Sequence, residues 1–192
     1  ESFVMNIFVL DKDPKISAEM MCDKHVVKMI VESAQMLSTV HRYLDGNEYI
    51  SYSKNGRRIK RWTHDTDRVD SEMKLFKSVM LNHPCTIWTR QSLGNYCWLA
   101  SHALHLCREY THRYGREHKT EGLINWFIRN YPKTLYGFHI TEFAQAMPDE
   151  YKVNGDAPQA YRKYYMGEKN GFAKWTNRLV PDWWSIVEEI PV

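Results

Sequence analysis

Apolar residues recur with a helical period between residues 14 and 44, and they predict one long, largely buried helix. Asp13 supplies an N-cap and Pro14 takes the first helical position, as is typical of a helix start. The run Asp45-Gly46-Asn47 predicts its end. The apolar positions that set the period are Ile16, Met20, Val27, Ile30, Ala34, Leu37 and Leu44.

Polar residues form a line along this otherwise apolar helix. His25, Lys28, Glu32 and Gln35 share one side at 100° per residue. Ionised side chains do not stay in an apolar core without partners. The line therefore faces a cavity filled with water or ligand, or closes into an ion-pair network. The third interpretation is an ordinary i,i+4 pair of Lys28 and Glu32 at the edge of the protein.

The rest of the chain predicts a mainly α-helical protein with little β-structure. Residues 6 to 10 suit a short N-terminal strand, and Asn55-Gly56 between β-capable arms predicts a hairpin. Further helices are expected at residues 66 to 81, 84 to 114 with a break near 93 to 95, 120 to 130, and 157 to 167. We expect residues 1 to 192 to form a single compact helical domain, with a short N-terminal strand and a small basic β-hairpin.

Composition narrows the class of protein. The 192 residues carry a net charge of +3 and four cysteines without C-x-x-C spacing, and they contain no apolar run near membrane-spanning length. These features favour a cytoplasmic protein with reduced thiols and no membrane partner. The phosphate-loop, dinucleotide, nucleophile-elbow and H-E-x-x-H motifs do not occur. We therefore expect no cofactor.

Three clusters mix basic and aromatic residues, which is the combination that binds phosphates and stacks on bases. They are the hairpin, residues 108 to 119, and the segment from Tyr161 to Arg178. Solvated helix faces have similar compositions, so a single cluster would carry little weight. The residues predicted to contact nucleic acid are Arg57, Arg58, Lys60, Arg113, Tyr161, Arg162, Lys163, Tyr165 and Lys169.

Two groups of residues could instead bind a metal. His102, His105 and Glu109 lie on one helical stripe, although the same helix also has the residues of a packing element. His64 and Asp65 form a His-Asp doublet, with His41 upstream, that is similar to the doublet of helical metal-dependent phosphohydrolases. Asp65 also suits a plain helix N-terminus. The leading hypothesis uses no metal.

Several runs resemble a phage-type protein family without an assigned activity: residues 23 to 29, Asn82-His83-Pro84 before Trp88, Asn95-Tyr96 before Trp98-Leu99, and Ala146-Met147-Pro148 before Tyr151. The N-terminal strand and helix, Asn82-His83, and Lys163-Tyr164-Tyr165 with Gly167 and Lys169 also resemble the small all-helical pyrimidine-dimer DNA glycosylases. A phage origin would place the protein in the host cytoplasm.

The glycosylase resemblance implies an all-helical architecture and a C-terminal segment lying against DNA. Those enzymes use an N-terminal α-amine and a glutamate early in the first long helix. Here we expect a natural start at Met5, followed by Asn6, with residues 1 to 4 as a leader. His25 best aligns with the glutamate, so the chain departs from the family pattern at both positions.

The leading hypothesis is a DNA base glycosylase-like enzyme whose cavity, lined by the first long helix, accepts a base or nucleotide turned out of the duplex. Glu32 would act as general base or stabilise a cationic sugar. Lys28 or His25 would keep Glu32 ionised or protonate the leaving base. The alternatives are a non-catalytic protein that binds a nucleotide or small phosphate ligand, and a metal-dependent His-Asp phosphohydrolase.

Overall fold

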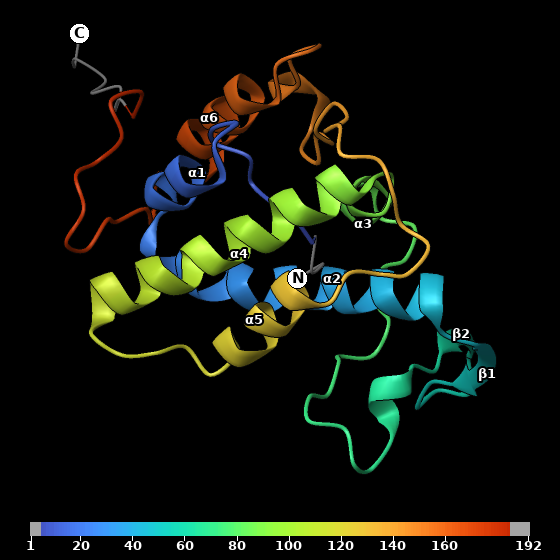
Figure 1. The fold of residues 1–192 in the computed structure, drawn as a ribbon. Helices are drawn as coiled ribbons and strands as arrows, with labels where there is room; N and C mark the ends of the chain where they lie inside the picture. The colour runs from blue at the N-terminus through green and yellow to red at the C-terminus, as the bar shows by residue number, and fades with distance from the viewer. Residues whose placement is uncertain (1–4, 185–192) are drawn as a thin grey trace, which may run out of the picture.

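The computed structural model describes residues 5 to 184, and they form a mainly helical fold with one small hairpin (Figure 1). The expected leader at residues 1 to 4 lies outside this range. The helices are α1 (Pro14–Met20), α2 (Asp23–Asp45), α3 (Pro84–Thr89), α4 (Leu93–Tyr114), α5 (Glu121–Arg129) and α6 (Ala157–Glu168), and two 3-10 turns are η1 (Asp65–Asp67) and η2 (Asp149–Tyr151). The strands β1 (Glu48–Tyr52) and β2 (Arg58–Trp62) pair antiparallel, with Ser51 opposite Ile59.

Helix α2 is the centre of the fold. It contacts α3, α4 and α5, while α1 packs on α4 (Figure 1). Val26, Ile30, Ala34 and Leu37 are fully buried within it, as its apolar pattern predicts. The mainly α-helical class predicted from the sequence is confirmed. No helix in the described part of the chain is long and apolar enough to cross a membrane.

The first predicted helix is interrupted at Met21 and Cys22. Both residues have extended backbone conformations and fully buried side chains, so α1 and α2 are separate elements. The predicted break of the third helical region is present between α3 and α4. Ser92 caps α4 there by accepting a hydrogen bond from the backbone nitrogen of Asn95 at 3.0 Å.

The predicted strand at residues 6 to 10 is wrong. These residues are buried but form no strand, because their backbone is bonded to side chains rather than to a neighbouring strand. The amides of Ile7 and Phe8 donate to the side-chain oxygen of Asn6, and the amide of Leu10 donates to the Ser17 hydroxyl. Phe8 also has a positive φ of 54°, which a regular strand does not accommodate.

The predicted helix at residues 66 to 81 is also wrong, since only the turn η1 is regular there. Side chains of α2 bond to the backbone of this segment instead. Arg42 donates to the carbonyls of Leu75 and Phe76 and forms a two-point ion pair with Asp67. The Thr39 hydroxyl accepts from the amide of Val79. These bonds replace the helical ones and hold an irregular segment against α2.

Gly46 joins α2 to the hairpin at a point where the backbones come very close. A Cβ at this position would lie 1.8 Å from the carbonyl oxygen of Thr63 and 2.4 Å from that of Arg42. Only glycine therefore fits between the end of α2 and the residues after β2.

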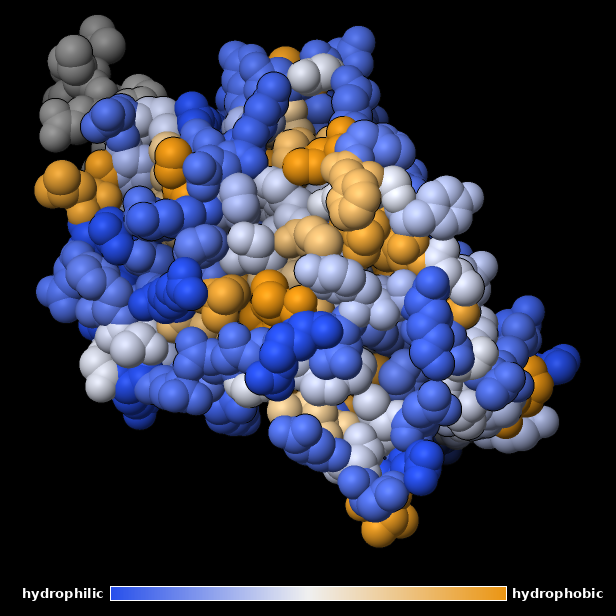
Figure 2. All heavy atoms as spheres, in the orientation of Figure 1, coloured by the Kyte–Doolittle hydropathy of each residue, from blue (hydrophilic) through white to orange (hydrophobic). Residues whose placement is uncertain are grey.

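The face of the molecule drawn in Figure 2 is mostly hydrophilic, and its apolar residues gather in separate patches.

Candidate active site

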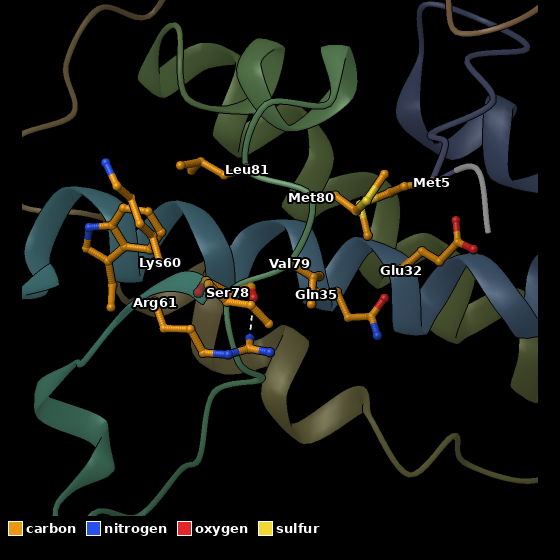
Figure 3. A pocket seen from close by; sticks show the side chains of 11 residues that line it. Met5, Glu32, Gln35, Lys60, Arg61, Ser78, Val79, Met80 and Leu81 are labelled. Carbon is orange, nitrogen blue, oxygen red and sulfur yellow. Dashed lines mark hydrogen bonds between the residues drawn. The ribbon is translucent and has the colours of Figure 1, made fainter. Parts of the chain in front are cut away.

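A cavity of about 470 Å³ lies between α2, β2 and the irregular segment at residues 78 to 81 (Figure 3). Helix α2 contributes Glu32 and Gln35, and the hairpin contributes residues 59 to 62. Met5 completes the lining beside Glu32. Most of these side chains are apolar, so the few polar groups stand out as the ones that could orient a ligand.

Glu32 is a buried carboxylate at the end of this cavity, with a residue exposure of 7%. Its Oε2 accepts a hydrogen bond from the backbone nitrogen of Asn6 at 3.2 Å. Its Oε1 lies 3.6 Å from the Nζ atom of Lys28. One oxygen is therefore held by the N-terminal segment and the other by a lysine one helical turn away.

Burial raises the pKa of Glu32 above its ordinary value, while the Asn6 amide and Lys28 oppose that increase. The Lys28 side chain is 45% exposed, so it supplies charge to Glu32 from the solvent side. The predicted pair of Lys28 and Glu32 is present. Lys28 is not among the residues that line the cavity.

His25 lies elsewhere, in an aromatic cluster. Its ring stacks on Phe8 with centroids 4.3 Å apart, and its Nδ1 lies 2.6 Å from the hydroxyl of Tyr165. Burial, followed by the charges of Lys169, Lys28 and Lys24, lowers the pKa of His25 to about 3. The expectation that His25, Lys28 and Glu32 line one cavity is corrected: of the three, only Glu32 is in the lining, and aromatic packing holds the His25 ring away from it.

Two further polar groups of the cavity have unused hydrogen-bonding capacity. The Ser78 hydroxyl is buried without a partner in the described residues. The Gln35 carboxamide forms no hydrogen bond to another described side chain or backbone group. Next to Ser78, Arg61 donates to the Ser78 carbonyl at 2.7 Å, shown by the dashed line in Figure 3. The cavity thus offers a carboxylate, a carboxamide and a hydroxyl between apolar walls.

The hairpin exposes the cations predicted for it. Arg57, Arg58 and Lys60 are exposed, and Lys60 both lines the cavity and lies 3.6 Å from Glu48. Lys163 is exposed on α6, and Lys169 lies over the ring of Tyr164 at 4.7 Å. Arg162 is half-buried and donates to the Leu10 carbonyl at 2.9 Å.

Three of the residues predicted to contact nucleic acid are interior. The side chain of Arg113 is fully buried and pairs with Asp23 and Glu109, both at 3.0 Å. Tyr161 and Tyr165 are fully buried in the core. The prediction is corrected for these three residues, because their charge or ring face is already used within the protein.

The histidine stripe of α4 does not converge. His102 is buried, with Nδ1 3.0 Å from the carbonyl of Pro14, and Glu109 is occupied by Arg113 and Arg178. The second candidate metal group, predicted as His64 and Asp65 with His41, has a different carboxylate in the structure. His41 and His64 come together with Asp45, and not with Asp65, whose side chain is 88% exposed.

Sequence reasoning missed Met5, Asn6, Ser78 and Asp45. The first two precede any regular element, and Ser78 was expected inside a helix. Asp45 had a usable signal, since it follows His41 by four residues on one helix face.

The sequence model of one known family, described as pyrimidine dimer DNA glycosylase, matches residues 5–122. The match covers more than half of the 192 residues, so the chain belongs to this family. No curated protein and no solved structure matches the chain. Every residue that lines the Glu32 cavity falls inside the matched segment. The class is therefore that of DNA glycosylase-like proteins that act on nucleic acid, with DNA as partner.

Proposed function

We propose that the Glu32 cavity accepts a base or nucleotide turned out of a DNA duplex, and that Glu32 promotes cleavage of its glycosidic bond. The observation that carries the proposal is a buried carboxylate at the end of an apolar cavity, within the segment matched to the glycosylase family. Enzymes that act on a base bind it outside the stack, between apolar walls, and read its edge with a few polar groups. The side chains of Gln35 and Ser78 are suited to forming hydrogen bonds with the edge of such a base.

Glu32 acts on the sugar through its charge. When the bond between C1′ and the base nitrogen breaks, its electron pair leaves with the base and positive charge develops on the sugar. A fixed carboxylate stabilises that charge where little water competes. Water then adds its oxygen to C1′ and gives its proton to Glu32. The departing base takes up a proton from the solvent, and Glu32 returns its proton to the solvent. Lys28 keeps Glu32 ionised before the reaction.

The N-terminal segment positions the carboxylate. In the described chain the nitrogen of Asn6 is an amide, so it donates to Glu32 and is not a nucleophile. A chain that began at Asn6 would carry its α-amine at this same place, beside Glu32. The structure thus favours Glu32, rather than His25, as the counterpart of the family's glutamate.

The direct test is single-turnover incubation with a duplex that contains one pyrimidine dimer, beside an undamaged duplex of the same sequence. Glycosidic cleavage at the dimer, without a borohydride-trapped adduct, is the result expected for the chain as described. A trapped adduct would indicate attack by an amine instead of water. Tight binding without any cleavage would favour the non-catalytic nucleotide binder.

Replacing Gln35 with leucine should weaken binding of a dimer-containing duplex about tenfold, because one hydrogen bond to the extruded base is lost. Affinity for undamaged duplex should not change, since that DNA places no base in the cavity. Fluorescence anisotropy with both duplexes measures the two affinities. Gln159→Leu, at an exposed position of α6, is the matched control. Equal weakening on both duplexes would remove Gln35 from base recognition.

Neutralising Arg57, Arg58 and Lys60 together should reduce the salt dependence of duplex binding by about 2.7 units in the slope of log K against log salt. These cations are exposed on the hairpin beside the cavity, so each can neutralise one phosphate. Titrations at several salt concentrations give the slope. The control neutralises Lys12, Lys15 and Lys152, which are exposed cations outside the three basic and aromatic clusters. An unchanged slope in the hairpin variant would show that DNA does not contact the hairpin.

A further inference from the structure

A second polar cluster lies at the C-terminal end of α2. His41 and Asp45 are one turn apart on that helix, and His64 is the N-cap residue of η1. One ligand atom from each residue lies within 4.8 Å of the others. The three residues line a separate cavity of about 400 Å³ that shares no lining residue with the Glu32 cavity.

We propose that His41, Asp45 and His64 bind one divalent transition-metal ion, with Zn²⁺ as the best fit. Two imidazoles and one carboxylate form a ligand set that zinc accepts, and three protein ligands leave a fourth position open. Ideal tetrahedral ligands lie about 3.4 Å apart for bonds near 2.1 Å. The ligand atoms lie within 4.8 Å of one another, so metal binding requires side-chain rotations that bring them closer.

The hydrogen bonds of His41 leave one ring nitrogen ready for the metal. The hydroxyl of Tyr96 lies 2.9 Å from the Phe127 carbonyl and 3.1 Å from the Asn130 carbonyl, so its proton is directed to these acceptors. The same oxygen must then accept from Nε2 of His41, which is 2.8 Å away. Nε2 carries the proton, and Nδ1 keeps its lone pair. Such an outer partner fixes the tautomer of a metal-binding histidine.

Outer contacts also hold the other two ligands. Both carboxylate oxygens of Asp45 accept from the backbone nitrogen of Lys133, at 3.2 and 3.1 Å. Nδ1 of His64 lies 3.1 Å from the amide nitrogen of Thr66 and 2.9 Å from its hydroxyl. Without a metal, Nδ1 accepts from that amide. When Nε2 binds the metal, Nδ1 carries the proton and donates to the Thr66 hydroxyl.

The three residues line this cavity together with Arg68, Lys133, Trp126 and Tyr131, and with Asp65 and Asp70. Arg68 and Lys133 supply positive charge to the cavity, and each is paired with a carboxylate, Asp70 and Asp65 respectively. The cluster therefore suits a metal that holds water or a phosphate oxygen, and its Asp45 distinguishes it from the His64-Asp65 doublet noticed in the sequence.

The test is titration of the metal-stripped full-length chain with Co²⁺, followed by displacement with Zn²⁺. We expect one equivalent to bind with visible bands of a four-coordinate nitrogen and oxygen site. Asp45→Asn should weaken binding by more than the 10- to 100-fold typical of losing an outer partner. This variant keeps the side-chain shape, and thermal melting verifies its fold. Thr66→Val should weaken binding less.

His105→Ala is the matched control, because it removes a histidine from the other candidate stripe on α4. It should bind Co²⁺ as the wild type does. An intense near-ultraviolet charge-transfer band would assign the metal to a cysteine and overturn the proposal. Absence of stoichiometric binding, or unchanged affinity in Asp45→Asn, would overturn it as well. None of these readouts uses base release, so failure here is separate from failure of the Glu32 proposal.

Discussion

Replacing Glu32 with glutamine should slow base release by about 100- to 1000-fold, the loss typical of deleting one preorganised electrostatic group. Glutamine keeps the size of the side chain and can still accept from the Asn6 amide, so the cavity and the affinity for DNA should be retained. The charge next to the sugar disappears. Single-turnover base release and equilibrium DNA binding, measured on the same duplex, separate the two effects.

The pH dependence adds an independent readout. Because burial raises the pKa of Glu32 above its ordinary value of 4.5, the rate should fall with acidification already above pH 4.5. The fall should be absent from the residual rate of Glu32→Gln. Glu72→Gln, at an exposed position, is the matched control. Equal loss of binding and base release in Glu32→Gln would make Glu32 a ligand anchor rather than the group that lowers the barrier.

Helices and turns that are determined by neighbouring residues were predicted from the sequence. The apolar period predicted α2, the Asn55-Gly56 turn predicted the hairpin, and the helix expected at residues 157 to 167 is α6. The polar line on α2 includes Glu32, which the structure places in the lining of the cavity. These features depend on neighbours within a few residues, which a single sequence displays directly.

The failures came from long-range contacts. Residues 68 to 81 have apolar spacing that suits a helix, but Arg42 and Thr39 bind their backbone from α2. Arg113 was predicted to bind phosphate, but it forms an ion pair with Asp23, which is distant in the sequence. The same limit hid Ser78 and Met5, because the cavity exists only where three distant segments meet.

The protein should lose stability steeply as the pH falls below 6.5, because several of its histidines are buried, His25 and His102 among them. Burial lowers the pKa of His25 to about 3 and that of His102 to about 4. Between these values and the ordinary pKa of 6.5, the unfolded chain binds protons that the folded chain does not. The stability contributed by the neutral rings is thus present above pH 6.5 and is lost on acidification.

His25 and His102 each lower the free energy of unfolding by about 1.4 kcal/mol per pH unit in this window. Together they remove about 5 kcal/mol between pH 6.5 and 4.5, which is comparable with the whole stability of many domains. Urea unfolding at half-unit pH intervals, in the presence of a chelator, measures the slope. The geometry of His102 strengthens the expectation, because its Nε2 is buried without a partner in the described residues and a proton there would have no acceptor.

His102→Phe should lower the slope by about 1.4 kcal/mol per pH unit, since phenylalanine keeps the stacking on Trp98 and binds no proton. The variant loses the hydrogen bond to the Pro14 carbonyl, so its stability at pH 7.5 should be lower than that of the wild type by about 1 kcal/mol. The two stability curves should therefore converge on acidification and then cross. His139→Asn, which removes an exposed histidine, is the matched control. Parallel curves for His102→Phe and the wild type would show that His102 is protonated in the folded protein and would contradict its burial as a neutral ring.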